Sequence, residues 1–330
     1  MGMRIPNSLA GLGMVPPYSL AQMLGMVPPP ASSVPQWMHV TSRFSQFLVN
    51  LQLTAAQDAD GRRKKAGVVS CLNSAYYGST SEFDNSFYIG SWGKGTAIRP
   101  PRDVDVYFVL PSAAYGRFGA YGYNPQSALL QEVKRVLQRS YPTTTNIRGD
   151  GPVVLVGFDS YSVEVVPVFF VGDFRYWVCD TKNGGSYKQT APWAEIGHIE
   201  NADKRNANNL RPLIRMLKSW QACCSVPIKS FHLELLAVDY LDQSQWRFKN
   251  IFWYDWVVRD FFLYMISRAN TFATAPGTGE YMWLGETWKS KAESAYARAA
   301  KASSYEAQNM MIAAGEEWQK IFGSNIPRTV

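Results

Sequence analysis

Two aspartates separated by a single residue are the side chains in this sequence best suited to chemistry. Asp103 and Asp105 begin the run DVDVYFVL, which otherwise reads as a buried strand. Side chains alternate along a strand, so both carboxylates lie on one face, about 6–7 Å apart. Buried like charges repel each other, and we therefore predict that they bind a divalent cation such as Mg²⁺, which prefers carboxylate and phosphate oxygens. The alternatives for this pair alone are that the aspartates are exposed residues at a strand end, or that they pair with Arg102 and Arg99.

A third carboxylate favours the cation site. Glu164 interrupts the apolar strand pattern YSVEVVPVFF and shares a face with Ser162 and Val166. If this strand pairs with residues 103–110, Glu164 completes a cluster of three carboxylates that could hold two cations for a phosphoryl transfer. Asp159 is a rival for the third position, but it lies in a GFDS turn and is typical of a loop residue.

A glycine-rich turn precedes the aspartates. Gly90 and Ser91 begin the segment GSWGKG, directly after the apolar residues FYI. Such a turn can bring backbone N–H groups and a hydroxyl onto a phosphate. The spacing matches neither a P-loop nor a Gly-x-Gly-x-x-Gly fingerprint. On this pattern alone, a plain turn and a phosphate site are both open.

The second half of the chain adds candidates for phosphate and base contacts. Arg211, Arg215 and Lys218 recur at i, i+4 and i+7 beside an apolar helix face. The stripe is either solvated or aimed into a cleft, where Lys218 would be a compact charge for a triphosphate. Downstream, Ser230 could cap a helix or touch a phosphate, and Phe231 could stack on a base or pack.

The elements that must position these residues follow from periodicity. We expect strands near Phe87–Ile89, 104–110, 153–156 and 161–170, with a helix around 129–137 between them. Helices are predicted before them, over 41–51 and 55–77, and after them, over 206–222, 230–242, 252–269 and 287–322. The fold class is therefore α+β.

This order of elements predicts three segments. Residues 1–37 form a flexible, proline-rich tail in which LGMVPP occurs twice. Residues 38–200 form a mixed core with N-terminal helices, and residues 201–330 form a helical lobe. The Arg62–Lys65 run is better explained by a solvated helix face than by nucleic-acid binding.

Composition narrows the class of protein. The net charge of +7 suits a phosphate-bearing ligand. The four cysteines lack the spacing of a metal site, which favours reduced thiols in a cytoplasmic protein. No apolar run is long enough to span a membrane, and prolines interrupt any signal-peptide core near the N-terminus.

The combined motifs resemble a known superfamily. Gly90-Ser91, Asp103-Val104-Asp105 and Glu164 ahead of Pro167 follow the layout of nucleotidyltransferases such as DNA polymerase beta and the poly(A) polymerases. The chain is more closely similar to the bacterial cGAS/DncV-like nucleotidyltransferases (CD-NTases) of CBASS anti-phage defence. RPLIRMLKSW, KSFHLELL and the ending with Trp318, Phe322-Gly323 and Pro327 resemble their helical lobe. The resemblance covers residues 40–327.

The resemblance implies a polymerase beta-like core with a mixed sheet, a C-terminal helical lobe, and an active-site cleft between them. It also implies a role for each candidate residue. The catalytic carboxylates that hold two Mg²⁺ ions, for which Mn²⁺ can substitute, would be Asp103, Asp105 and Glu164. The nucleotide-binding residues would be Gly90, Ser91, Lys218 and Ser230 at phosphates and Phe231 at a base.

Two positions depart from the family pattern. Glu164 stands where aspartate is usual, which keeps the charge and alters the metal geometry. Phe231 stands where tyrosine is frequent, which removes only a hydroxyl. Neither change indicates an inactive enzyme.

The implied activity is synthesis of a purine cyclic dinucleotide second messenger, including the cGAMP type, from ATP, GTP or both, with release of pyrophosphate. Its implied partners are a downstream effector that responds to the product and regulatory CBASS proteins. Activation by DNA is not expected, because the helical lobe shows no Cys/His cluster like the zinc insertion of the animal DNA sensor. The alternatives are a nucleotidyltransferase that acts on RNA 3′ ends or on proteins, a non-catalytic nucleotide-binding module, and a basic RNA-binding protein.

Overall fold

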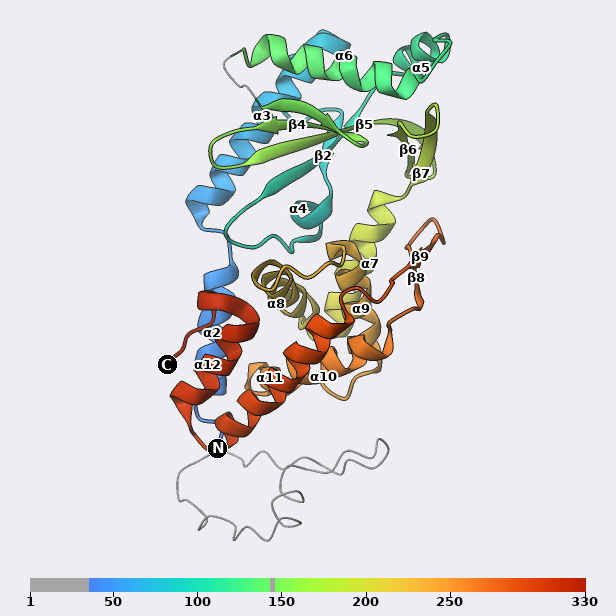
Figure 1. The fold of residues 1–330 in the computed structure, drawn as a ribbon. Helices are drawn as coiled ribbons and strands as arrows, with labels where there is room; N and C mark the ends of the chain where they lie inside the picture. Colours follow the sequence, from blue (N-terminus) through green and yellow to red (C-terminus); the bar gives the residue numbers. More distant parts are fainter. Residues whose placement is uncertain (1–35, 143–145) are drawn as a thin grey trace.

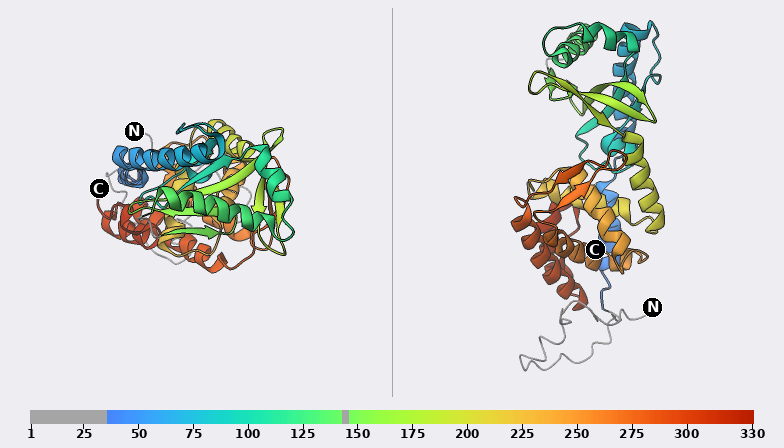
Figure 2. Two further views of the ribbon diagram at one scale, coloured as in Figure 1. Left: turned by 90° about the horizontal axis from the view of Figure 1, so that it is seen from above. Right: turned by 90° about the vertical axis from the view of Figure 1, so that its right-hand side faces the viewer.

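A computed structural model describes residues 36–142 and 146–330 of the chain. The tail predicted over residues 1–37 lies, except for its last two residues, outside this part. The described residues form a sheet lobe and a helical lobe, which are stacked along one axis (Figures 1 and 2). None of the described helices is both long and apolar enough to cross a bilayer.

The sheet lobe is built on a mixed sheet, as the sequence predicts. Its central strands are β2 (Asp103–Val109) and β5 (Ser162–Gly172), which run parallel to each other. The other pairings are antiparallel and involve β1 (Ser86–Tyr88), β3 (Ile147–Asp150), β4 (Val153–Gly157), β6 (Arg175–Asp180) and β7 (Ser186–Thr190). The mixed α+β fold class is therefore confirmed.

Helices cover one face of this sheet. α3 (Ala55–Tyr77) and α6 (Pro125–Ser140) lie above it, with the short α5 (Ser112–Gly119) beside α6 (Figure 1). The β2 side chains directed toward these helices are fully buried in one apolar cluster, namely Val104, Val106 and Phe108. Because side chains alternate, the aspartates of β2 lie on the opposite face, where α4 (Gly90–Lys94) packs against the strand.

The helical lobe has a separate apolar core. Its helices are α7 (Pro192–Arg205), α8 (Leu210–Cys223), α9 (Ser230–Gln243), α10 (Tyr254–Ser267), α11 (Lys289–Ala307) and α12 (Met311–Phe322), with 3-10 turns at Ile251–Trp253 and Gly323–Asn325. The N-terminal α2 (Val40–Leu51) packs in the same core, where the Phe44 ring lies 5.2 Å from that of Trp318. The sequence analysis grouped this helix with the nucleotidyltransferase core, whereas its apolar face is buried by the helical lobe. The predicted boundary near residue 200 remains a prediction.

Three details differ from the sequence-based expectation. The single helix predicted over 287–322 is divided at Asn309, whose φ of 54° is left-handed, so that α11 and α12 pack against each other. The region after residue 200 also contains a hairpin, β8 (Phe272–Thr274) and β9 (Tyr281–Trp283). Finally, the helix predicted over 206–222 is α8, and α7 before it was not predicted.

The basic side chains of the Arg62–Lys65 run make contacts within the sheet lobe. Arg62 pairs with Asp58 on the exposed side of the helix. Lys65 is buried instead, and its ammonium group donates to the hydroxyl of Ser86 over 2.8 Å. These contacts favour a structural explanation for the run.

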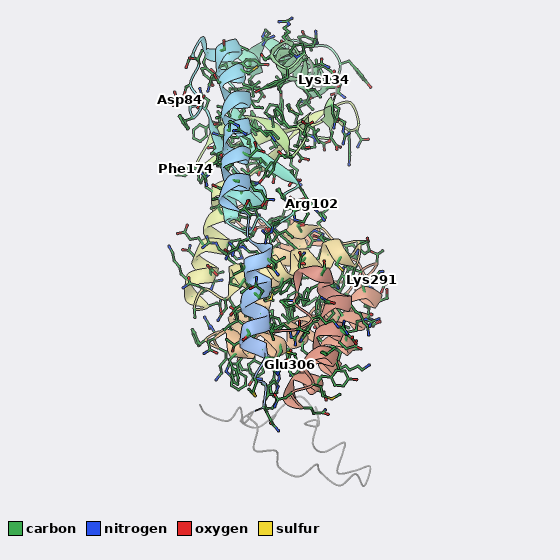
Figure 3. All side chains as sticks on the ribbon, turned by 90° about the vertical axis from the view of Figure 1, so that its left-hand side faces the viewer. Asp84, Arg102, Lys134, Phe174, Lys291 and Glu306 are labelled. Atoms are coloured by element: carbon green, nitrogen blue, oxygen red, sulfur yellow. The ribbon has the colours of Figure 1, made fainter. Side chains whose placement is uncertain are left out.

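A buried arginine fastens the C-terminal tail to the helical lobe. Arg43 of α2 is fully buried and pairs with Glu306 over 2.7 Å. Its guanidinium also donates to the backbone carbonyls of Met311, Pro327 and Arg328. Glu306 lies beside α2 at the far end of the helical lobe (Figure 3). One side chain therefore joins α2 to the start of α12 and to the residues that follow it.

We expect Arg43→Met to lower the free energy of unfolding by about 3–5 kcal/mol, because it leaves the Glu306 carboxylate buried without its cation. Urea unfolding followed by circular dichroism measures the change. Arg62→Ala is the control, since the Arg62 side chain is 61% exposed and should change stability by less than about 1 kcal/mol. Equal effects of the two substitutions would contradict the tethering role of Arg43.

Candidate active site

The three predicted carboxylates come together on the sheet face that bears α4. Asp103, Asp105 and Glu164 each offer an oxygen within 4.8 Å of the others. The parallel pairing of β2 with β5 places Asp105 directly beside Glu164, as the sequence analysis required. Among the described residues, this is the one such group of potential metal ligands, and Asp159 does not belong to it.

The charges of this triad are poorly compensated. Burial raises the pKa of Asp105, the charges of Asp103 and Glu164 add to the rise, and those of Lys218 and Lys94 oppose it, with a net pKa of about 7. Burial also raises the pKa of Glu164, and Asp103 adds to the effect. An all-oxygen donor set with excess negative charge fits a divalent cation such as Mg²⁺ or Mn²⁺.

The alternative explanation, in which nearby arginines pair with the aspartates, does not describe the structure. Arg99 donates to the backbone carbonyls of Val49 and Asn50. Arg102 lies at the junction of the two lobes (Figure 3). Within residues 36–142 and 146–330, no ion pair joins either arginine to Asp103 or Asp105.

The glycine-rich turn lies directly against the aspartates. Gly90 has a φ of 53°, and a Cβ atom at this position would lie 2.0 Å from Oδ2 of Asp105. The backbone N–H of Ile89 donates to the carbonyl of Asp105 over 3.0 Å, and the indole N–H of Trp92 donates to the carbonyl of Asp103 over 3.0 Å. Only glycine satisfies both the backbone conformation and the space. Gly90 and the adjoining Ser91 are thus placed beside the triad, and their phosphate contacts stay a prediction.

Lys218 is buried in an ion-pair cluster at the lobe junction. Its ammonium group lies 2.7 Å from Glu234 and donates to the hydroxyl of Thr96 over 2.8 Å. Glu234 also pairs with Lys94 over 2.9 Å, and Glu195 lies 3.2 Å from Lys94. Lys218 is therefore not a solvated cation, and its contact with a triphosphate stays a prediction.

The two arginines of the predicted basic stripe hold α4 from the other lobe. Arg211 donates to the carbonyl of Lys94 over 3.0 Å, and Arg215 donates to the carbonyl of Gly95 over 2.8 Å. They bind backbone acceptors at the C-terminal end of α4, so they are not simply solvated cations.

Ser230 and Phe231 begin α9 near this cluster. Ser230 is the first residue of the helix rather than its cap, and its hydroxyl donates to the amide oxygen of Gln221 over 2.8 Å. The Phe231 ring is partly buried against the helical core, and the Lys94 ammonium lies 4.3 Å from its centroid. The structure thus brings Phe231 next to Lys94, while base stacking and the phosphate contact of Ser230 stay predictions.

Sequence reasoning missed Lys94, Glu195 and Glu234. A signal for Glu234 exists, because it is a single carboxylate inside the apolar helical run FHLELLAV. Its helical spacing shows that it is buried, and a buried carboxylate requires a cationic partner. The partner itself could not be read from the sequence.

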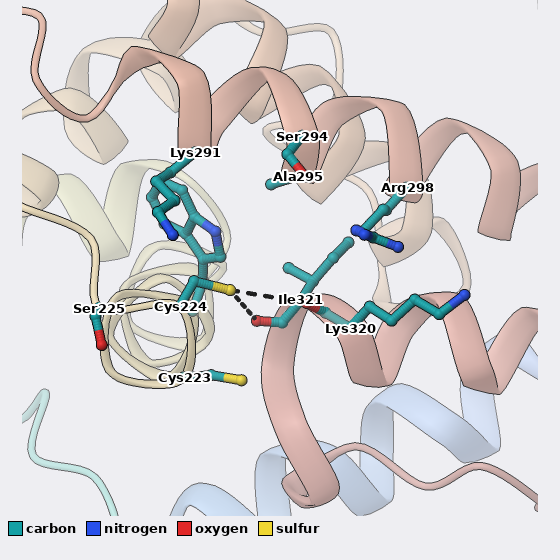
Figure 4. Close-up of a pocket in the computed structure, with 10 residues that line it drawn as sticks. Cys223, Cys224, Ser225, Lys291, Ser294, Ala295, Arg298, Lys320 and Ile321 are labelled. Carbon is teal, nitrogen blue, oxygen red and sulfur yellow. Dashed lines mark hydrogen bonds between the residues drawn. The ribbon is translucent and has the colours of Figure 1, made fainter.

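A pocket of about 320 Å³ lies elsewhere, between α8, α11 and α12 (Figure 4). Its floor includes Cys224, whose thiol contacts the carbonyls of Lys320 and Ile321. Burial raises the pKa of Cys224 to about 11, so the thiol is protonated at neutral pH and a poor nucleophile. Two of the rim cations, Arg298 and Lys320, already pair with Glu317. This pocket offers no comparable chemistry.

Comparison with known proteins identifies the class of this site. Residues 38–206 match the Second Messenger Oligonucleotide or Dinucleotide Synthetase domain. A cyclic AMP-AMP-AMP synthase of Escherichia coli (strain MS 115-1) is 25% identical over 241 residues, which cover 68% of this chain and 70% of that protein.

Solved structures show the same fold. The CdnC:HORMA-deltaN complex of E. coli MS115-1 superposes with a TM-score of 0.63 at 19% identity, covering 87% of this chain and 98% of the other. The Vibrio cholerae DncV cyclic AMP-GMP synthase, in complex with the linear intermediate 5′-pppA(3′,5′)pG, superposes with a TM-score of 0.60 at 13% identity, covering 88% of each chain.

We expect Gly90→Ala to weaken divalent-cation binding at least about tenfold, because the added methyl group displaces a ligand carboxylate. Titration with Mn²⁺ followed by electron paramagnetic resonance measures the affinity. Gly116→Ala in α5 is the matched control, since a Cβ there meets nothing within 4 Å. Unchanged Mn²⁺ affinity in Gly90→Ala would show that this residue does not shape the triad.

The raised pKa of Asp105 predicts that, in the absence of divalent cations, the free energy of unfolding decreases as pH rises. The folded chain keeps the Asp105 proton up to about pH 7, whereas the unfolded chain releases it near pH 4, so stability from this group falls as pH rises between these values. In chelator, Asp105→Asn should melt roughly 2–6 °C above the unsubstituted chain at pH 8, and close to it at pH 4. Thermal melts at both pH values measure the difference. A gap that is the same at both pH values would refute the assignment.

Proposed function

The chain belongs to the family of second messenger oligonucleotide or dinucleotide synthetases, and we propose that it makes a purine cyclic oligonucleotide from ATP, GTP or both. The observation that carries this proposal is the uncompensated triad of Asp103, Asp105 and Glu164, which lies against the glycine turn at Gly90. A family of cyclases and an intact set of acidic ligands together favour catalysis over nucleotide binding alone.

The proposed chemistry is nucleotidyl transfer. A ribose hydroxyl of the acceptor forms a bond to the α-phosphorus of the donor, the bond to the bridging oxygen of the β-phosphate breaks, and pyrophosphate leaves. The hydroxyl proton passes to solvent. Further transfer on the linear intermediate closes the ring, at the second transfer for a cyclic dinucleotide and at the third for a cyclic trinucleotide, and each transfer releases one pyrophosphate. Two divalent cations, held by the triad, would supply neutralisation of the triphosphate and acidification of the hydroxyl.

The remaining residues position the donor in this proposal. Gly90 and Ser91 offer backbone and hydroxyl donors beside the triad. Lys218 offers a buried positive charge for the departing pyrophosphate, and Ser230 a second hydroxyl. Phe231 offers a ring face for a purine. Such positioning supplies most of the catalysis in phosphoryl transfer, because the protein performs little covalent chemistry of its own.

The ring size has two candidates. The sequence motifs lead us to propose a cyclic dinucleotide, including the cGAMP type. The similarity to a cyclic AMP-AMP-AMP synthase favours a cyclic trinucleotide. The dinucleotide candidate contains adenine, guanine or both, whereas the trinucleotide candidate, by similarity, contains adenine.

We further propose that the product acts on an effector protein in anti-phage defence, and that a protein regulator binds the enzyme. The solved complex of CdnC with a HORMA protein supports the second part by similarity of fold.

The test is incubation of the protein with all four labelled nucleoside triphosphates and Mg²⁺, followed by phosphatase treatment and mass spectrometry. We expect a phosphatase-resistant product whose mass gives the bases and the ring size. Asp103→Asn with Asp105→Asn should reduce its formation on the order of 10³-fold or more, whereas Asp159→Asn should leave it unchanged. Product from the double variant at an undiminished rate would exclude the triad. A requirement for an RNA or protein acceptor would favour the rival transferases, and binding of ATP without turnover would favour a non-catalytic module.

A further inference from the structure

We propose that Glu234 is a positioning residue for the nucleotidyl transfer, which holds the glycine turn of one lobe and the phosphate-directed lysine of the other in a fixed relation. This inference rests on the proposed function. In it, Glu234 acts through the two lysines and does not itself contact the substrate.

The first support is a buried double ion pair across the lobe junction. Glu234 comes from α9 of the helical lobe, and its side chain is 4% exposed. One carboxylate oxygen lies 2.9 Å from Lys94 of α4 in the sheet lobe, and the other lies 2.7 Å from Lys218 of α8. A single carboxylate thus spans both lobes, and the geometry specifies both lysines at once.

The second support is the charge balance of the cluster. Two lysines, Lys94 and Lys218, face two carboxylates, Glu195 and Glu234, so the set is neutral. Burial alone would raise the pKa of Glu234, but the two lysines outweigh it and lower the pKa. The ion pairs are therefore formed at neutral pH, unlike the triad, whose charges lack partners.

The third support is the short length of α4. Lys94 ends this helix and Gly90 begins it, about 6 Å apart along the axis at about 1.5 Å per residue. Gly90 is in contact with Asp105, while Arg211 and Arg215 bind the carbonyls at the other end. A shift of Lys94 is therefore transmitted to the turn that packs on the triad.

The two lysines have different remaining capacity. A lysine ammonium has three N–H donors. Lys94 is occupied by Glu234, Glu195 and the face of Phe231. Lys218 uses two donors for Glu234 and the Thr96 hydroxyl, at 2.7 and 2.8 Å. Its third contact, with the Thr96 carbonyl, is long at 3.5 Å, so this is the donor that a phosphate would most easily take over. Lys94 thus anchors the helix, and Glu234 orients Lys218 so that this weakly bound donor has one direction.

The experiment is Glu234→Gln, which keeps the shape of the side chain and removes its charge. We expect kcat for cyclic product to fall on the order of 10- to 100-fold, because misplacement of reacting groups by about 1 Å has effects of this size. The affinity for an ATP analogue with a methylene between the α- and β-phosphorus should stay within about threefold or increase, because the uncompensated lysines attract the triphosphate. This separation of kcat from binding distinguishes positioning from partial unfolding, which lowers both the active fraction and the binding stoichiometry.

Glu317→Gln is the matched control. Glu317 is also a buried carboxylate that binds cations of the helical lobe, but its partners are Arg298, Lys301 and Lys320. It should lower the melting temperature without a selective loss of kcat. An equal loss of kcat in this control would assign the effect to general destabilisation and overturn the inference.

A second variant covers the case in which Glu234→Gln does not fold. Thr96→Val removes the hydroxyl that accepts from Lys218 and donates to Glu234, and should lower kcat several-fold with analogue binding retained. If the unsubstituted chain makes product and these variants turn over within about twofold of it, the inference is wrong and the proposed function stands. If the unsubstituted chain makes no product, the proposed function itself fails.

Discussion

The parallel pairing of β2 with β5 is the contact on which the rest of the arrangement depends. Its register places Asp105 beside Glu164 and so concentrates three carboxylates on one patch of the sheet. The same register places the intervening valines of both strands in the apolar core under α3 and α6. A slip by one residue would move every carboxylate into that core and every valine out of it, so the burial of the core also specifies the site.

Two lysines at the lobe junction lie near this concentration of negative charge without neutralising it. Lys94 and Lys218 lower the pKa of Asp105, but each is already paired with Glu234. The lysines therefore moderate the repulsion within the triad and remain committed to the junction. The arginines of α8, bound to the last carbonyls of α4, make the same junction rigid from the backbone side. Both lobes thus meet at one short helix beside the triad.

Much of the sheet lobe could be predicted, because alternation reports which side chains share a face. The pattern around Asp103 and Asp105 gave both the strand and the exposed acidic face, and Glu164 needed only the pairing to be added. The contact that joins the two lobes could not be predicted, because Lys94 and Glu234 are 140 positions apart in the chain. Periodicity identifies a polar face and is silent on what packs against it. For the same reason, the packing of α2 in the apolar core of the helical lobe could not be predicted, and the interruption at Asn309 was hidden inside a continuous helical pattern.

The net charge distinguishes two neighbouring clusters of ionisable side chains, the lysine–glutamate cluster and the triad, which look alike in the sequence. The lysine–glutamate cluster is buried and neutral, so it is complete without a ligand, as expected for a structural element. The triad is half-buried, and no ion pair joins its three carboxylates to a lysine or arginine among the described residues. Its negative charge can therefore be balanced only by a bound cation. Once cations are bound, the site attracts negative charge, because the cations attract phosphate oxygens. An acidic patch can therefore become a triphosphate site, and the neutral cluster beside it contributes by holding its lysine in place rather than by adding charge.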